Sequence, residues 1–175
     1  WDPEPAALPV EERIALAMAA ESAALDYDPR ITNSEGGEYS HQEGRVVFAN
    51  SHGFTGGYRG SSVVLSVAPV AADNGGMQRD GWYSFQRRLR SLESPEAIGR
   101  TAAERALRRL GSRKVATQQV PVVFDPDMAA SLLRTLCNAA SGSTIYRSAS
   151  FLTGRLDQQV ASTNLSVVDD GRMVG

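Results

Sequence analysis

Two histidines and a glutamate are the residues best suited to hold a metal ion. His41 and Glu43 are two positions apart, so in a strand both side chains would lie on one face. A hairpin could bring His52 close to them. A zinc site needs three or four nitrogen, sulfur or oxygen ligands. This set therefore requires a particular strand register and a further ligand, and exposed turn histidines are the simpler interpretation.

Nucleophilic chemistry has weaker support. Cys137 is the single cysteine, has no histidine near it in sequence, and is expected to be a buried, inert thiol on a helix. Ser51 and His52 are neighbours in the chain, and adjacency alone does not give a serine–histidine pair catalytic geometry.

Phosphate binding is not favoured either. The glycine-rich segment 53–60 lacks the strand, GxxxxGK[ST] and helix context of a phosphate loop, so its glycines are expected to permit close strand approach. The basic residues between Arg105 and Lys114 lie at the C-terminal end of a predicted helix. Cations are favoured there by the helix dipole, so this run is expected to be a solvated helix cap instead of a phosphate-binding face.

Helical and strand patterns give the elements that carry these residues. The spacing predicts a helix over 10–26, with an apolar stripe of Ile14, Ala17, Met18 and Leu25. Residues 31–88 combine frequent glycines with short runs of β-branched or aromatic residues. This pattern predicts an antiparallel meander with strands near 45–50, 61–70 and 76–88. The sequence predicts turns at residues 50–53 and at Asn74-Gly75, which tolerate positive φ.

Two further helices are marked by the same starting signal. Ser94-Pro95 and Asp125-Pro126 each place a capping side chain before a proline. They predict one helix from Pro95 to about residue 111 and another from Pro126 to about residue 140. The second helix carries an apolar stripe of Met128, Leu132, Leu136 and Ala140. A short strand is expected over 120–124, and loop with strand over 143–175.

Composition limits the class of protein. The chain has 175 residues, 42% of them hydrophobic, and a net charge of −2, which gives no general attraction to nucleic acid or to anionic membranes. No apolar run is long enough to span a bilayer, and no signal peptide is visible. The single cysteine favours a reducing compartment, so a cytoplasmic location is expected.

The fold class is predicted as α+β, an antiparallel β meander with flanking amphipathic helices, followed by a truncated second α+β domain.

The order of five short motifs is more specific than any one of them. They are Asp28–Gly37 (DPRITNSEGG), Ala49–Phe54 (ANSHGF), Asn74–Asp80 (NGGMQRD), Val120–Phe124 (VPVVF) and Ser141–Ser148 (SGSTIYRS). This series resembles the TldD/PmbA family, the modulators of DNA gyrase, and in particular its PmbA/TldE branch. The resemblance covers essentially the whole chain.

The resemblance implies an organisation and a role. Residues 1–115 would be a PmbA/TldD-like central domain, and 116–175 the beginning of a metalloprotease-like C-terminal domain. Trp1 and Gly175 are then expected to be internal positions of a longer protein. Family members are expected to pair as TldD–TldE heterodimers, cytosolic zinc metalloproteases that act on unfolded peptides.

The resemblance also implies where a catalytic metal would be held. The TldD branch carries His-Glu-x-x-x-His on the helix that follows the VPVVF-like strand. The matching positions here are Arg134, Thr135 and Ala139, and an arginine has no lone pair to give to a metal. No catalytic or metal-binding residue is therefore expected in this chain, and zinc is expected only in a TldD-like partner.

The sequence thus predicts a non-catalytic PmbA/TldE-like subunit that binds unfolded peptide beside its partner, without direct contact to nucleic acid or membrane. Two alternatives stay open. One is an interaction or regulatory module of the gyrase-modulator type, and the other is an active metallopeptidase using His41, Glu43 and His52. Candidate interaction residues form one turn, Asn50, Ser51, His52, Gly53 and Phe54.

Overall fold

The computed structural model describes residues 1–170, which form two compact units. The first unit comprises Trp1–Val115, and the second begins at Ala116. Among residues 1–170, no helix combines the length and the apolar character needed to cross a bilayer.

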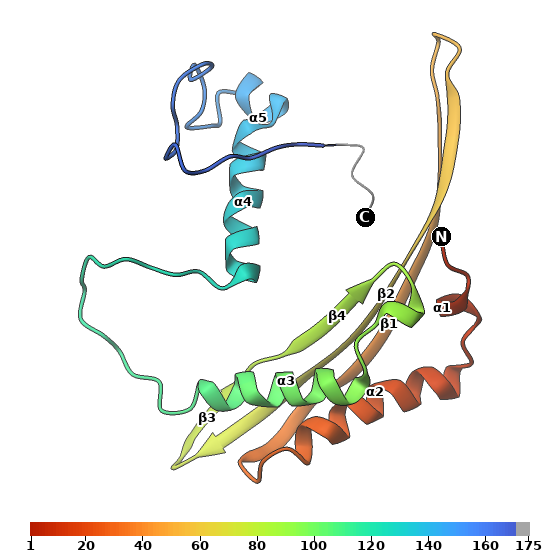
Figure 1. Cartoon of the computed structure of the whole chain (residues 1–175), viewed down its shortest axis with the longest axis vertical. Helices are drawn as coiled ribbons and strands as arrows, with labels where there is room; N and C mark the ends of the chain where they lie inside the picture. Colours follow the sequence, from red (N-terminus) through yellow and green to blue (C-terminus); the bar gives the residue numbers. More distant parts are fainter. Residues whose placement is uncertain (171–175) are drawn as a thin grey trace. The chain divides into compact units, whose positions relative to one another are not determined.

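The first unit is an antiparallel sheet with helices packed on one face (Figure 1). This arrangement confirms the predicted α+β class. Its elements in chain order are α1 (Glu4–Ala7), α2 (Val10–Leu25), β1 (Ile31–Ala49), β2 (Thr55–Asp73), β3 (Gly76–Arg79), β4 (Trp82–Gln86), the 3-10 helix η1 (Leu89–Ser91) and α3 (Pro95–Arg108).

Strand β2 is the centre of the sheet. It pairs with β1 from Ala71 opposite Ile31 to Thr55 opposite Ala49, and with both β3 and β4 on its other side. The predicted hairpin turn is confirmed, because Asn74 has φ 48° and Gly75 has φ 80°. The chain is therefore a meander whose third strand is interrupted between β3 and β4.

The core lies between β2 and the helices. Alternate β2 residues from Ser61 to Ala71 are buried, whereas the residues between them are only partly covered, as the predicted alternation requires. Leu65 and Val67 pack against small helical residues, and Ile98 is the largest fully buried side chain that the helices add. The small members of the core are Ala20, Ala24, Ala71, Ala102, Ala103 and Ala106.

Helix α2 packs through a different face from the predicted one. Of the predicted stripe, Ile14 and Met18 are 53% and 60% exposed, and the buried residues are Ala20 and Ala24. The reason is close backbone approach. A Cβ on Gly37 would lie 2.2 Å from the Ala17 carbonyl oxygen, and one on Gly99 would lie 2.4 Å from that of Ala20. Only small residues fit such a contact, so the larger side chains of α2 face outward.

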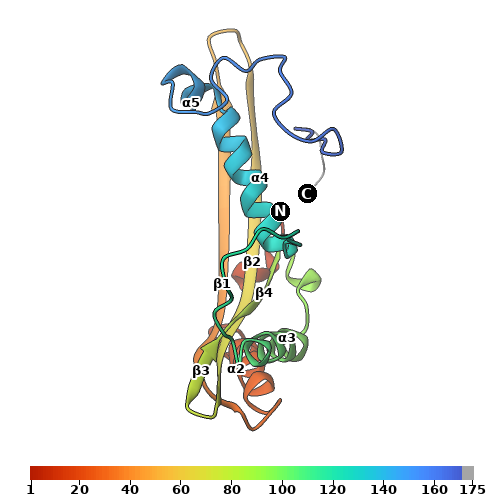
Figure 2. The same ribbon diagram turned by 90° about the vertical axis from the view of Figure 1, so that its left-hand side faces the viewer.

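Strands β1 and β2 are much longer than the sequence indicated. Each has 19 residues, and beyond the helices they continue as a two-stranded ribbon that ends in the turn at residues 50–54 (Figure 2). We call residues 44–60 the arm. The predicted strand over 45–50 is the distal part of β1, whose remainder is rich in glycine and charged residues and lacks a strand-like pattern.

The second unit contains α4 (Pro126–Ala140) and α5 (Gly142–Tyr146). The predicted cap of α4 is confirmed, because the Asp125 side chain accepts a hydrogen bond of 3.1 Å from the Asp127 backbone N–H. The apolar stripe of α4 is not buried, since Met128 and Leu132 are both exposed. Ala139 is the one hydrophobic residue of this unit that is buried among the described residues.

Two strand predictions for the second unit are wrong. Residues 120–124 have no regular secondary structure, and Val123 is 97% exposed. The described residues after α5, 147–170, form turns and irregular chain instead of strand. An isolated strand leaves its backbone hydrogen-bonding groups unpaired, and no neighbouring strand pairs with either segment in the described part of the chain. The last part of the predicted loop and strand, 171–175, lies outside the described residues.

Candidate functional site

The turn predicted as an interaction site is the tip of the arm. The Asn50 Oδ1 accepts hydrogen bonds from the backbone N–H groups of His52, at 3.0 Å, and Phe54, at 3.2 Å. Gly53 has φ 84°, a conformation that favours glycine. Asn50 and Gly53 therefore shape the turn, whereas Ser51, His52 and Phe54 present exposed side chains.

The arm carries exposed apolar side chains next to this turn. The rings of Phe48 and Phe54 are in contact across the hairpin, with their centroids 5.8 Å apart and their planes tilted by 48°. Val46 and Tyr58 are directly opposite each other in the register and are both exposed. Together these side chains make an apolar surface on the arm, which is a common property of segments that contact other molecules.

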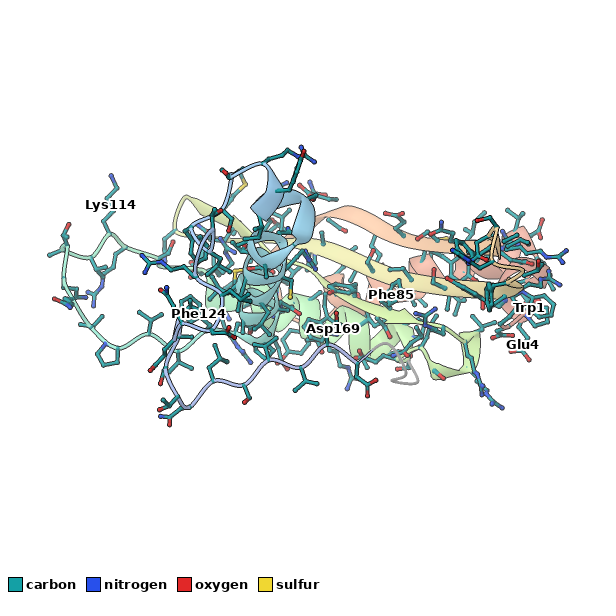
Figure 3. All side chains as sticks on the ribbon, turned by 90° about the horizontal axis from the view of Figure 1, so that it is seen from above. Trp1, Glu4, Phe85, Lys114, Phe124 and Asp169 are labelled. Atoms are coloured by element: carbon teal, nitrogen blue, oxygen red, sulfur yellow. The ribbon has the colours of Figure 1, made fainter. Side chains whose placement is uncertain are left out.

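The base of the arm is tied to the N-terminal segment. The Arg59 guanidinium lies 3.7 Å from the centroid of the Trp1 ring and also forms an ion pair with Glu43. Trp1 and Glu4 lie at the same end of the unit, as Figure 3 shows. The Asp2 backbone N–H donates to the Ser61 hydroxyl at 2.8 Å, so the first residues hold β2 where the arm begins.

The outer edge of β1 is a second feature of this surface. Among residues 1–170, β1 pairs only with β2, so its other edge is open over most of its length. Near its start, the Ile31 N–H donates to the Asp28 carbonyl and the Gly36 N–H donates to the Ser34 hydroxyl. The pairing with β2 is irregular between Ile31 and Gly37, where Gly36 has φ 111°. An open edge of this kind can accept an extended peptide as an added strand.

The possible metal ligands in the arm do not come together. His41 pairs in register with Val63, whereas His52 is in the tip, more than eight residues along the strand, or roughly 27 Å at the usual rise. Glu43 is ion-paired with Arg59, and the His41 ring lies 6.3 Å from that of Tyr39. Within residues 1–170 no group of three or more His, Cys, Asp or Glu side chains could hold a metal ion.

Helix α4 holds the three positions matched to the metal motif. Arg134 is exposed, and the Thr135 hydroxyl donates to the Ser131 carbonyl at 3.0 Å within the helix. Ala139 is buried, and its carbonyl accepts a bond of 2.7 Å from the Ser150 hydroxyl. An arginine, a back-bonded threonine and an alanine therefore do not fit a zinc ion.

Cys137 is exposed on the same helix, so the expectation of a buried thiol is wrong. The reason is that α4 buries very little of its surface within its own unit, as the exposed Met128 and Leu132 also show.

Three carboxylates of the first unit have pKa values below the ordinary value. Hydrogen bonds from Arg30 lower the pKa of Asp28 to about 2. Backbone N–H groups of Glu4 and Leu89 lower the pKa of Asp2. Burial acts to raise the pKa of Asp80, but the Gly81 backbone N–H and Arg105 lower it overall. Asp2 and Asp80 each bond to residues distant in the sequence, and Asp28 bonds to Arg30 within its own turn. These bonds indicate structural roles instead of proton transfer.

Sequence reasoning missed the groove beneath η1, which is lined by leucines from four separate segments. No single stretch of the sequence signals it, because Leu8, Leu16, Leu65 and Leu89 are brought together only by the fold. The Trp1–Arg59 contact was missed for the same reason.

Comparison with known proteins gives consistent matches over both units. Residues 3–110 match the family model of the PmbA/TldA metallopeptidase central domain, and residues 117–175 match that of the PmbA/TldA metallopeptidase C-terminal domain. The chain is 40% identical over 163 residues to the metalloprotease PmbA of Escherichia coli O157:H7, covering 93% of this chain and 36% of the relative. It is 35% identical to a PmbA homologue of Haemophilus influenzae, covering 86% of this chain and 34% of the relative.

Solved structures show the same likeness. A protein from Bacteroides thetaiotaomicron described as a modulator of DNA gyrase superposes with a TM-score of 0.83 at 30% identity, covering 93% of this chain and 37% of the other. A Thermotoga maritima protein with the same kind of description gives a TM-score of 0.80 at 24% identity, covering 88% of this chain and 35% of the other, and shares the fold. The chain thus spans about a third of the length of these relatives.

Proposed function

The chain belongs to the PmbA/TldA metallopeptidase family, and from this premise we propose that it is part of a non-catalytic subunit of the PmbA/TldE type. In this proposal the subunit pairs with a zinc-bearing TldD-like partner in the cytoplasm, and the pair degrades unfolded peptides. The subunit itself supplies binding surface and contacts neither nucleic acid nor membrane.

The composition of α4 is the observation that supports the non-catalytic assignment. At the positions matched to His-Glu-x-x-x-His, the Arg134 guanidinium has no lone pair to give to a metal, Thr135 bonds to the backbone of its own helix, and the Ala139 side chain has no ligand atom. Since these residues do not fit the metal, we assign this chain no metal-dependent step.

The open edge of β1 supports a role in peptide binding. Strand addition would hold an extended peptide through main-chain hydrogen bonds, so the affinity would depend little on the peptide's sequence. This tolerance suits a protease subunit that receives unfolded chains. The exposed side chains of the arm, above all Phe48 and Phe54, would add apolar contacts beside the edge.

Peptide binding by the assembled pair tests the second part of this proposal. We expect an unfolded peptide to bind the pair more tightly than the TldD-like partner alone. Val47→Lys, which adds a charge to an exposed position of β1, should weaken binding, because charges on an edge strand oppose strand addition. Glu11→Lys on α2 is the matched control and should bind like the unaltered pair. Equal binding with and without this subunit would remove the assignment.

A second function has one specific observation in its favour. Two solved structures with this fold are described as modulators of DNA gyrase. A role of this kind would make the arm a contact surface for another protein instead of for peptides. A binding competition with gyrase and a TldD-like chain as the two baits distinguishes the protease-subunit role from the gyrase-modulator role. We expect this protein to bind the TldD-like chain in preference to gyrase.

A further inference from the structure

A groove of about 660 Å³ lies in the first unit, between the first half of α2, η1 and the start of α3. We call it the leucine groove, because Leu8, Leu16, Leu65, Leu89 and Leu92 are among the residues that line it. Its volume falls within the range of about 300–1,000 Å³ that is typical of ligand-binding pockets.

The groove follows from how α2 and α3 pack. The two helices approach each other closely where Gly99 meets Ala20. Helix α2 continues well beyond this contact to Val10, whereas α3 begins only about one turn away, at Pro95. The first half of α2 therefore has no helix beside it, and the chain around η1 forms the opposite wall.

Hydrogen bonds fix the two walls. The Arg13 guanidinium donates to the carbonyls of Leu8, at 2.7 Å, and Ala6, at 2.8 Å, which holds the segment before α2 against the helix. The Leu89 backbone N–H donates to the Asp2 carboxylate at 2.9 Å, which anchors η1. These bonds hold both walls of the groove in place.

The charges at the groove are mostly negative. Glu12 lies on the α2 wall and Glu96 on the first turn of α3, and Arg90 is the one basic side chain of the lining. Glu93 accepts a hydrogen bond of 3.3 Å from the Trp82 indole N–H. An apolar ligand with positive charges at its ends is complementary to this arrangement, whereas an anionic lipid or nucleotide would be repelled.

The shape of the α2 wall favours a stretch of polypeptide. Glu12, Ala15, Leu16 and Ala19 follow one face of the helix for two turns, a length of about 10 Å. An extended chain rises about 3.3 Å per residue, so the wall matches roughly three residues of a peptide.

We propose that the leucine groove binds a short peptide segment that has apolar side chains at its centre and lysine or arginine on both sides. The apolar side chains occupy the space between the leucines, and the basic side chains pair with Glu12 and Glu96. This site is separate from the strand-addition surface on β1 and goes beyond the function proposed above.

Fluorescence anisotropy with labelled heptapeptides tests the site on the complete polypeptide that carries this sequence. The probe is Lys-Lys-Leu-Phe-Leu-Lys-Lys, compared with a version in which glutamate replaces lysine and one in which serine replaces the central three residues. We expect the probe to bind at least about tenfold more tightly than either, and higher salt to weaken it by screening the charges.

Variants distinguish this groove from a general attraction of basic peptides. Combining Glu12→Lys with Glu96→Lys should lower the affinity for the probe peptide about tenfold, because two favourable charge contacts become repulsive. Glu11→Lys, one residue away from Glu12 and outside the groove, is the matched control. Its affinity for the probe peptide should stay within about twofold of that of the unaltered protein. Ala15→Phe, at an exposed position of the wall, should block the groove and weaken the probe by a similar factor.

Three results would overturn the proposal. They are equal binding of the lysine and glutamate peptides, equal weakening by Glu11→Lys and the double variant, and unchanged binding by Ala15→Phe. Circular dichroism of each variant shows whether it has kept its helices. The metal content of the protein is independent of these results, so this inference and the proposed function can fail separately.

Discussion

The two units of the chain use the same helix-starting signal and reach different degrees of burial. Ser94-Pro95 begins α3, and Asp125-Pro126 begins α4, each with a side chain that accepts a backbone N–H of the first turn. Helix α3 buries Ile98 completely, whereas α4 leaves Met128 and Leu132 exposed. Local signals therefore decide that a helix forms, and only a packed partner decides whether its apolar face becomes core.

The largest test of this contrast removes one apolar side chain from each unit. Ile98→Ala should lower the free energy of unfolding by about 2–5 kcal/mol, because the side chain is fully buried and leaves a cavity. Leu132→Ala, at a position that is 51% exposed, should lower the free energy of unfolding by less than about 1 kcal/mol. Urea unfolding of both variants measures the difference, and similar losses would show that α4 is packed as tightly as α3.

A second comparison adds a methyl group to one glycine in each unit. Gly99→Ala should destabilise the first unit by about 1–3 kcal/mol, because its Cβ would lie 2.4 Å from the Ala20 carbonyl oxygen and force α2 away from α3. Gly142→Ala has no atom within 4 Å of the new Cβ and should be neutral or slightly stabilising. Thermal unfolding followed by circular dichroism measures both, and a tolerated Gly99→Ala would contradict the close packing.

The two helix caps allow a smaller, symmetrical test. Ser94→Ala and Asp125→Ala should each cost their helix about 1 kcal/mol. In the first unit this loss should appear in the global unfolding transition, since α3 is part of the core. In the second unit it should appear as faster hydrogen exchange in α4 alone. Equal effects of both variants on global unfolding would mean that the units unfold together.

Acid titration gives the smallest effect and concerns the first unit. The Asp28 carboxylate has its pKa lowered from 3.8 to about 2, so its contribution is complete above its unfolded pKa and is lost as the pH falls toward 2. The pair with Arg30, at 2.9 Å, lies within the short connection between α2 and β1. Asp28→Asn should flatten the dependence of stability on pH between about 4 and 2. An unchanged slope would show that the pair contributes nothing measurable.

Parts of the fold with strong local signals were predictable from the sequence. The Asn74-Gly75 turn requires two residues with positive φ, and the alternation from Ser61 to Ala71 requires one buried face. Both signals act between near neighbours. The face of α2 was mispredicted because its burial depends on Gly37 and Gly99, which lie far from it in sequence and admit only small side chains.

The candidate site shows the same limit. The tip of the arm was predicted as a turn, since Asn50 and Gly53 suit it, but the length of the arm was not, because glycine and charged residues interrupt the strand pattern of β1. The strand expected at 120–124 depends on a partner strand that the described residues do not provide. The leucine groove combines residues from four segments and could not be found before the fold was known.

The metal content of the purified protein tests the central claim most directly. Elemental analysis would be made on the complete polypeptide alone, on its complex with a TldD-like partner, and on the partner alone. The non-catalytic assignment predicts no bound zinc on this polypeptide and about one zinc per complex, carried by the partner. Stoichiometric zinc on this polypeptide alone would contradict it, because Arg134, Thr135 and Ala139 would then not define the metal-binding capacity of the chain.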